Sequence, residues 1–365
     1  GLTVYLNERP GLPVVSAGLV FKTGSAVNPL DKPGLANFTA AMIDEGTATR
    51  SALRIAEEVA GLGGTLTTSS SMDTLQVSMA SLARTFPQML DIVVDVVRRP
   101  SFPDAEMERQ RASRLAQLVQ QRANAGQVAN TVLSAALYGP AHPYGATDLG
   151  TEASNKAMTV ADVRGFWQRN FVPNNAALVV SGRITEAELR PLVERAFGDW
   201  AAGKPDTAPQ RQPRTTAARV IVVDRPGAPQ TQLRVGSIGA PRATPDYESI
   251  RLMNETLGGL FTSRININLR EDHGYTYGGN SGFVFRREAG PFMVSTGVRT
   301  DVTAPAVSEI LKELTRMREG GVTADELTLA KDSMVRSLPA DFETSGRVTA
   351  STVNLFAYDL EPDYY

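Results

Sequence analysis

The chain has 365 residues, a formal net charge of −2 and an apolar fraction of 42%. This length exceeds what one hydrophobic core usually fills, so we expect about two domains. The balanced charge argues against a nucleic-acid or anionic-membrane surface, and the absence of cysteine excludes disulfides and thiolate metal sites. No apolar run approaches the roughly 20 residues that span a bilayer. With only two histidines, a histidine-rich metal site on this chain alone is not expected.

The first 200 residues predict strands interleaved with helices, joined by glycine- and proline-containing turns. We expect strands over residues 2–6, 13–23, 65–71, 74–80 and 176–181. We expect helices over residues 33–45, 51–62, 86–98, 104–122, 127–137, 160–170 and 186–197.

Residues 201–216 are rich in proline, glutamine, alanine and threonine, which is typical of a linker or a long surface crossing. Beyond it the pattern begins again. We expect strands over residues 218–224, 230–238, 275–286 and 291–299, and helices over residues 246–257, 261–272, 303–318 and 324–338.

An internal duplication follows from this order, with an offset of about 220 residues between the two copies. We expect an N-terminal domain over residues 1–203, a linker over 204–216 and a homologous C-terminal domain over 217–365. The second copy has no equivalent of strand 176–181, so we expect it to be truncated at its end. The predicted fold class is α+β, with two tandem homologous domains that each pack a mostly antiparallel sheet against helices.

Residues 269–277 read Leu-Arg-Glu-Asp-His-Gly-Tyr-Thr-Tyr and place Arg270 seven positions before Tyr277. Gly274 is typical of a helix end, so Arg270 should lie in the last helical turn and Tyr277 near the start of the next strand. Both side chains donate hydrogen bonds and suit a carbonyl oxygen. Taken alone, the segment fits a simpler interpretation better: an arginine paired with an acidic neighbour beside a half-buried tyrosine.

An ordered set of short motifs over the whole length resembles the pitrilysin/insulinase family of zinc peptidases, the H-x-x-E-H inverzincins. The second half contributes the Leu-Arg-x6-Tyr segment. The first half contributes Gly24-Ser25, Gly34-Leu35-Ala36, Glu45-Gly46-Thr47, His142-Pro143-Tyr144-Gly145, Leu149-Gly150-Thr151 and Asn-Phe-Val-Pro-Asn-Asn over residues 170–175.

In active members of that family, two histidines one helical turn apart bind zinc, a glutamate between them acts as general base, and a later glutamate is the third ligand. The matching positions here are Asn37 and Ala41 for the histidines, Ala40 for the base and Gln117 for the third ligand. Alanine has no lone pair, and neutral Asn and Gln are poor ligands for Zn²⁺. The resemblance therefore predicts neither zinc nor catalysis in this motif.

The resemblance also implies that an arginine and a tyrosine of the second half hold the substrate backbone, and Arg270 and Tyr277 match that pair. We therefore expect the non-catalytic, substrate-binding subunit of a heterodimeric zinc metallopeptidase that cleaves extended peptides. Zinc and general base would come from a homologous H-x-x-E-H partner, and the two chains would close around an internal chamber. The other expected partners are peptide substrates. We expect no nucleic-acid partner and no transmembrane segment in this chain.

Two alternatives remain open. The family also includes inert scaffold subunits of a respiratory complex, although a scaffold has no evident need for Arg270 and Tyr277. An independent hydrolase could instead use His142 or His273, but neither has a Ser or Cys arrangement beside it, and His142 fits a loop-shaping role. The start at Gly1 without methionine is compatible with a removed signal peptide, and a bacterial periplasm is favoured over the cytoplasm.

Overall fold

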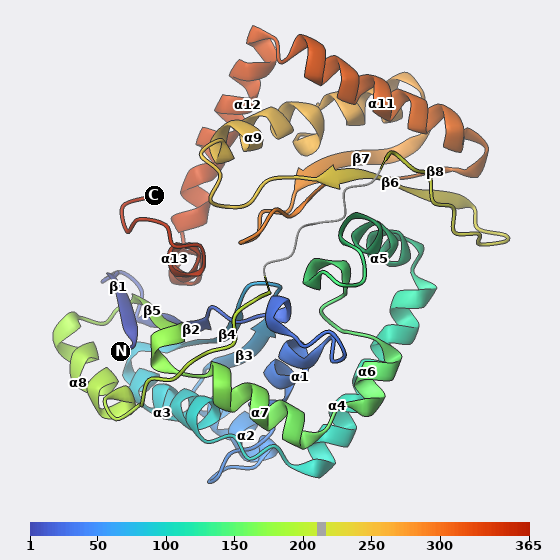
Figure 1. Ribbon diagram of the computed structural model, residues 1–365. Coiled ribbons are helices and arrows are strands. Elements are labelled where there is room, and N and C mark those ends of the chain that lie inside the picture. The colour runs from blue at the N-terminus through green and yellow to red at the C-terminus, as the bar shows by residue number, and fades with distance from the viewer. Residues whose placement is uncertain (210–216) are drawn as a thin grey trace. The chain divides into compact units, whose positions relative to one another are not determined.

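The computed structural model describes residues 1–209 and 217–365. The chain divides into two compact units. Unit 1 comprises Gly1–Val119, Thr147–Gln210 and Ala340–Tyr365, and unit 2 comprises Gln120–Ala146 and Arg211–Pro339. Each unit is therefore assembled from segments that lie far apart in the sequence, as the colour gradient of Figure 1 makes visible.

Unit 1 is built on a five-stranded sheet with the strand order β1-β5-β2-β4-β3. Strand β1 pairs with β5 in parallel, and the other neighbours are antiparallel. The strands are β1 (Thr3–Glu8), β2 (Val14–Phe21), β3 (Thr65–Ser70), β4 (Leu75–Leu82) and β5 (Ala176–Gly182). The helices are α1 (Leu35–Met42), α2 (Ala52–Gly61), α3 (Phe86–Arg98), α4 (Asp104–Ala123, whose last turn lies in unit 2), α6 (Glu152–Ala157), α7 (Val160–Asn170), α8 (Glu186–Phe197) and α13 (Ser345–Ala357).

Both faces of this sheet are covered, because side chains alternate along each strand. On β2, Leu19 and Phe21 join the large core formed with α1, α3 and α7. Val20 points the other way and packs with Val353 of α13. Strand β5 is buried along its whole length, as expected for a strand with neighbours on both edges and helices on both faces.

Unit 2 contains a three-stranded antiparallel sheet with the order β6-β8-β7. Its strands are β6 (Gln230–Ile238), β7 (Thr276–Phe283) and β8 (Pro291–Arg299). Its helices are α5 (Ala125–Tyr138), α9 (Tyr247–Asn254), α10 (Arg264–Asn266), α11 (Thr303–Gly320) and α12 (Ala324–Ser337), with π-helical turns over Glu255–Gly259 and Ile267–Asp272. The core of unit 2 joins β8 and α11 to the segment that carries Leu269.

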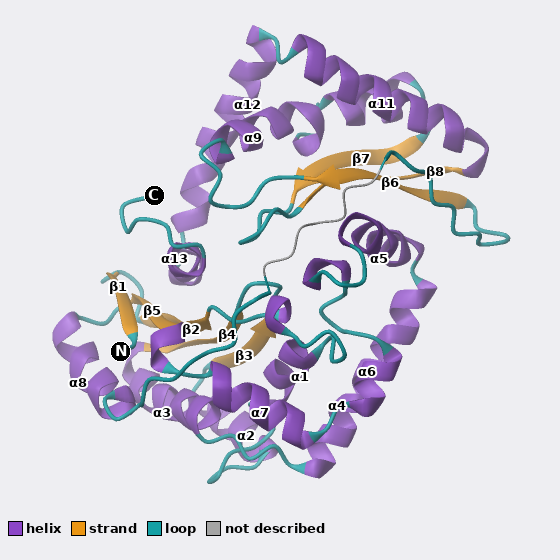
Figure 2. Cartoon of the chain, in the orientation of Figure 1, coloured by secondary structure: helices purple, strands orange, loops and turns teal. Residues whose placement is uncertain are grey.

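The duplication is visible in how the two units share helices. Helix α5 follows the long helix α4 and packs on β6 of unit 2, and helix α13 follows α12 and packs on β2 of unit 1. In unit 2, Arg234 of β6 donates to the side chain of Asn130 on α5, at 2.6 Å. Figure 2 shows the three strands of unit 2 with α5 on one side and α9 and α11 on the other. Each half of the sequence thus supplies one covering helix to the sheet of the other half.

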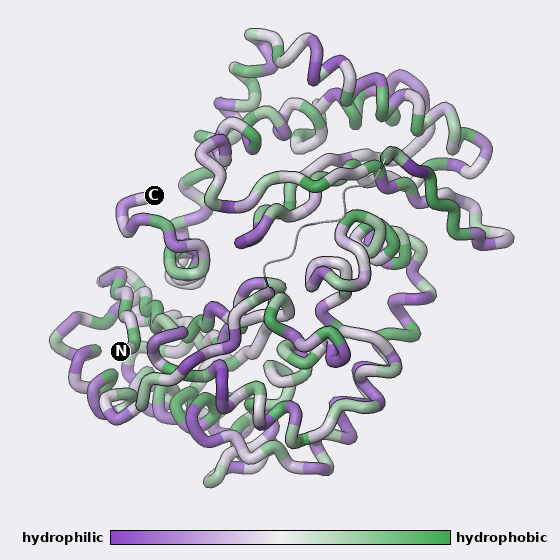
Figure 3. Tube along the Cα trace, viewed as in Figure 1, coloured by the Kyte–Doolittle hydropathy of each residue, from purple (hydrophilic) through white to green (hydrophobic). Residues whose placement is uncertain are grey.

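The α+β class and the two antiparallel-sheet domains are confirmed. Most expected elements agree closely with the structure; helix 86–98 and strand 291–299 match residue for residue. The helical tubes alternate between apolar and polar stretches, as one-sided burial requires (Figure 3). Within the described ranges, no helix is both long and apolar enough to cross a membrane.

Three expectations differ from the structure. The strand expected over 218–224 does not form, and Val220 and Val222 are 90% and 83% exposed. A strand needs a hydrogen-bonded neighbouring strand, and this segment has none among the described residues. The helices expected over 246–257 and 261–272 are shorter and end in π-helical turns. Helix α6 was not expected, because six residues are too few to show periodicity. The expected linker falls partly on residues 210–216, which lie outside the described ranges.

Candidate functional site

Helix α1 carries three of the positions that the resemblance matches to the zinc motif, Asn37, Ala40 and Ala41. It begins after Gly34, which has a φ of +95° and lies so close to the Leu149 carbonyl that a Cβ atom would meet that oxygen at 2.7 Å. Only glycine satisfies both constraints. Ala40 is 2% exposed and belongs to the core, and Ala41 is half-buried, so neither offers a polar atom. Of the three matching positions on this helix, only Asn37 has a polar side chain.

Arg114 of α4 is the side chain that meets Asn37. Its Nη1 donates to Asn37 Oδ1 at 2.7 Å, its Nε donates to Asn155 Oδ1 at 2.7 Å, and its Nη2 donates to the Leu149 carbonyl at 3.1 Å. The guanidinium also stacks over the Phe38 ring at 4.6 Å. Arg114 is only 3% exposed, and burial lowers the pKa of its guanidinium to about 10.

Gln117, expected at the third-ligand position, lies one turn further along α4. Its side chain is exposed and donates to Ser113 Oγ at 3.3 Å. Across residues 1–209 and 217–365, no three His, Cys, Asp or Glu side chains gather closely enough to hold a metal ion. The residues at the zinc positions therefore do not fit a zinc ion, and no catalytic step is assigned to them.

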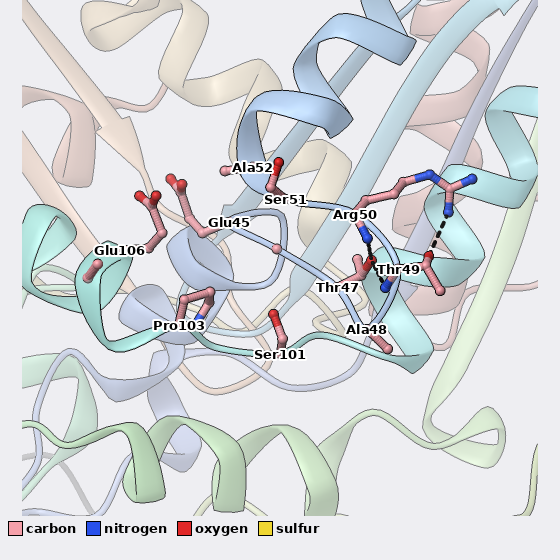
Figure 4. A pocket seen from close by; sticks show the side chains of 12 residues that line it. Glu45, Thr47, Ala48, Thr49, Arg50, Ser51, Ala52, Ser101, Pro103 and Glu106 are labelled. Carbon is pink, nitrogen blue, oxygen red and sulfur yellow. Dashed lines mark hydrogen bonds between the residues drawn. The ribbon is translucent and has the colours of Figure 1, made fainter.

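A groove of about 410 Å³ follows helix α1, at the Glu45-Gly46-Thr47 motif (Figure 4). Glu45 and Glu106 lie at one end of it, and Thr47, Thr49 and Arg50 at the other. The Glu45 carboxylate accepts a hydrogen bond from Gln110 at 2.6 Å and pairs with Arg109, so its charge is already partnered.

Behind the groove, Asp95 is fully buried and holds the loop in place. It accepts hydrogen bonds from Thr47 at 2.5 Å, Thr49 at 2.7 Å and Arg50 at 2.7 Å. Burial raises the pKa of Asp95, but these hydrogen bonds outweigh it and hold the pKa below its usual range. The motif residues thus have a structural role: they fix the turn between α1 and α2.

Arg270 of unit 2 lies in the π-helical turn Ile267–Asp272, as the last basic residue before strand β7. Its Nε is 3.4 Å from Glu271, and its guanidinium lies 4.5 Å from the centre of the Phe261 ring. The side chain is 34% exposed. The ion pair of the simpler interpretation is therefore present, but it is long and exposed, and such pairs contribute little to stability.

Tyr277 is 91% exposed, in contrast to the half-buried tyrosine of the simpler interpretation. The cause is a register shift in β7 between Thr276 and Gly279. The Thr276 hydroxyl donates to the Gly297 carbonyl at 2.7 Å, and the Thr296 hydroxyl donates to the Gly278 carbonyl at 2.9 Å. A bulge of this kind re-aims the side chain that it carries, which here points into solvent.

Asn266 ties the two segments together. Its amide donates to the Phe261 carbonyl at 2.6 Å, and its Oδ1 accepts from the Gly279 backbone at 3.1 Å. Arg264, which lies in α10 with Asn266, donates two hydrogen bonds of 2.6 Å from its guanidinium to the Glu326 carboxylate of α12. Hydrogen bonds of Arg264 and Asn266 thus fix the segments that carry the Arg270 turn and the Tyr277 bulge.

Gly258 and His142 have structural roles. A Cβ on Gly258 would meet the Ser281 backbone nitrogen at 2.3 Å, so this glycine permits close packing of its π-helical turn on β7. His142 is buried, accepts from the Tyr144 backbone at 3.1 Å through Nδ1, and packs between Tyr138 and Tyr144. The expected loop-shaping role of His142 is confirmed.

The sequence did not indicate a role for Arg114 or Asn266, and it placed Phe261 only on the approach to the helix that carries Arg270. For Arg114 a signal existed: it lies between Met107 and Leu118 on one stripe of α4, where an apolar residue is expected. Asn266 and Phe261 gave no comparable signal, because their roles depend on which segments come together in the fold.

The fold and these sites define a class of protein: an α+β chain with the two-domain architecture of an H-x-x-E-H zinc peptidase, with Asn37, Ala40 and Ala41 at the positions that the resemblance matches to its zinc motif. The model of the family described as insulinase (peptidase family M16) matches residues 3–147, and that of the peptidase M16 inactive domain matches residues 157–334. The chain belongs to peptidase family M16.

Similar proteins agree with this membership. The chain is 25% identical to an uncharacterized zinc protease of Mycobacterium leprae, over 92% of this chain and 75% of that protein. It is 23% identical to a non-peptidase homolog, YmxG, of Helicobacter pylori, over 98% and 82% of the two chains. The crystal structure of a peptidase M16 inactive domain from Pseudomonas fluorescens superposes with a TM-score of 0.93 and 27% identity, covering 100% of this chain and 87% of that one.

Proposed function

We propose that this chain is the non-catalytic, substrate-binding subunit of a two-chain zinc peptidase of family M16. Zinc and the general base would come from a homologous partner with an intact H-x-x-E-H motif. The observation that carries the proposal is a contrast: Arg114 closes the former zinc face, whereas Arg270 and Tyr277 present unburied donors on segments fixed by hydrogen bonds.

The chemistry of the pair fits an extended peptide. The Tyr277 hydroxyl and the Arg270 guanidinium can each donate to a peptide carbonyl oxygen. The fixed positive charge of Arg270 can also stabilise the oxyanion that forms when water attacks that carbonyl, and such a donor is commonly worth about 3 kcal/mol in the barrier. Backbone-directed hydrogen bonds of this kind select extended peptides and depend little on the side-chain sequence.

The relatives support a family of mixed activity. One similar chain is called an uncharacterized zinc protease and another a non-peptidase homolog, and these names support a family that includes chains without peptidase activity of their own.

Reconstitution tests the proposal. Cleavage of an unstructured fluorogenic peptide is measured with this chain alone, with an H-x-x-E-H homologue from the same genome alone, and with their equimolar mixture, and the zinc content of each chain is determined. We expect activity from the mixture only, with zinc on the homologue. Equal activity from the homologue alone would indicate a scaffold instead, and zinc-dependent cleavage by this chain alone would contradict the proposal outright.

A further inference from the structure

The former zinc face contains a buried cation whose partners are all neutral. Arg114 donates to two asparagine oxygens, Asn37 and Asn155, and to the Leu149 carbonyl. A fourth, longer contact of 3.4 Å reaches the Gly34 carbonyl. Among the residues that the structure describes, no carboxylate pairs with it. A buried arginine normally has an acidic partner, so this arrangement needs an explanation.

We propose that Arg114 takes the place of a metal ion on this face: its guanidinium joins α1, α4 and residues 149–155, and it excludes a divalent cation from the Asn37 position even where metal ligands are present. The inference concerns the folded chain by itself and does not depend on a partner subunit or on the proposed function.

Arg114 joins three segments of the chain at one point, as a metal ion would. A metal ion fixes side chains and carbonyls from several segments at one point, and the guanidinium does the same with donors in a planar fork. Its acceptors come from the start of α1, from the turn at Leu149 and from α6. Asn155 is itself fixed, because its amide donates to the Leu149 and Thr151 carbonyls at 2.8 Å.

Arg114 and a metal ion would also compete for the same lone pair on the side chain at position 37. The Arg114 guanidinium faces the side chain at position 37, since its Nη1 lies 2.7 Å from Asn37 Oδ1. A histidine there would meet that donor with the nitrogen it needs for a metal. A dication beside the guanidinium would also be repelled in a site that water screens poorly.

It follows that restoring the ligands alone should not restore the metal site. The first variant carries Asn37→His, Ala40→Glu, Ala41→His and Gln117→Glu with Arg114 retained. The second adds Arg114→Leu. Zn²⁺ affinity is measured by competition with a chromophoric chelator, and bound zinc by mass spectrometry of the folded protein. We expect the second variant to bind one zinc at least about 100-fold more tightly than the first. Equal affinities in the two variants, tight or absent, would overturn the inference.

Glutamate at buried position 40 can impair folding, so a milder series tests the same cation without zinc. Asn37→Asp gives Arg114 a carboxylate in place of a neutral oxygen and should raise the melting temperature by about 2–4 °C. Asn37→Ala and Arg114→Lys should lower it, because lysine lacks the planar fork. The control is Asn354→Asp, the same change at an exposed position of α13. A melting temperature unchanged or lowered by Asn37→Asp would contradict the idea of an uncompensated cation.

Discussion

Unit 1 has an arginine beside the positions matched to the zinc motif, and unit 2 has one in the turn before β7. The two arginines make different contacts. Arg114 is 3% exposed, and its hydrogen-bond donors are taken by protein acceptors. Arg270 is 34% exposed, with one long ion pair and one aromatic contact. A donor already bonded within the protein cannot bind a substrate. The comparison teaches that the donors of Arg114 serve the fold of unit 1, whereas Arg270 keeps donors that solvent can reach, as the proposed substrate-binding role requires.

The largest expected effect concerns the ion pair between Arg264 and Glu326, which fixes the segment that leads to Arg270. Arg264→Ala would leave the Glu326 carboxylate without its bidentate partner and should lower the free energy of unfolding by about 3 kcal/mol. Chemical denaturation measures this change, with exposed Arg299→Ala as the control.

The same ion pair predicts a pH dependence. Hydrogen bonds from Arg264 lower the pKa of Glu326 to about 2, below its unfolded value. The pair therefore contributes its full stability above about pH 4.5 and loses it as the pH falls toward 2. Denaturation at pH 7 and pH 3 should show a smaller difference between wild type and Arg264→Ala at the lower pH; an equal difference would contradict the assignment.

The second prediction compares the two arginines directly. Arg114→Met should cost about 2–3 kcal/mol of stability, because it leaves buried asparagine and carbonyl oxygens unsatisfied. Arg270→Met should cost less than about 0.5 kcal/mol, because its pair with Glu271 is exposed. Urea unfolding of both variants provides the measurement. Similar costs would show that the two sites do not differ in the way described.

A third, smaller effect concerns Asp44, which follows helix α1. Burial raises the pKa of Asp44 to about 6, above its ordinary value, so the ionised carboxylate is disfavoured in the folded state. The penalty grows as the pH rises from about 4 to about 6 and is complete above that range. Asp44→Asn should therefore stabilise the protein by about 1–2 kcal/mol at pH 7.5 and by little at pH 4. The melting temperatures of both proteins at these two pH values give the comparison.

The smallest expected effect lies in the aromatic contact of Arg270. Phe261→Ala removes a cation–π interaction of about 0.5–1 kcal/mol and should loosen the guanidinium without altering the fold. In the reconstituted enzyme we expect a two- to five-fold loss of kcat/KM. Phe261→Leu, which keeps apolar contact without the ring, separates stacking from packing.

Much of the fold could be predicted because its signals are local. Helix 86–98 has a proline in its first turn and a strong apolar stripe, and strand 291–299 combines an apolar first half with β-branched residues. Strand 218–224 has the same apolar character, yet it does not form, since a strand depends on a neighbour that local sequence cannot reveal. The π-helical turns at Glu255–Gly259 and Ile267–Asp272 likewise depend on packing against β7.

The candidate site divides in the same way. Gly274, as a helix end between the two residues, placed Arg270 in the last helical turn and Tyr277 near the start of a strand, and both placements agree with the structure. The exposure of Tyr277 could not be predicted, because it arises from a bulge pinned by Thr276 and Thr296 across two strands. The contact between Asn37 and Arg114 joins residues 77 positions apart and required the fold.

The most direct test of the account is the turnover of the reconstituted two-chain enzyme with Arg270→Ala and Tyr277→Phe combined in this chain. Arg299→Ala with Tyr365→Phe, a matched pair of exposed residues, serves as the control. We predict a fall in kcat of at least about 100-fold with the complex still assembled by size-exclusion chromatography, since each lost donor is worth up to about 3 kcal/mol in the barrier. Turnover equal to that of the control pair would contradict a substrate-binding role for this subunit.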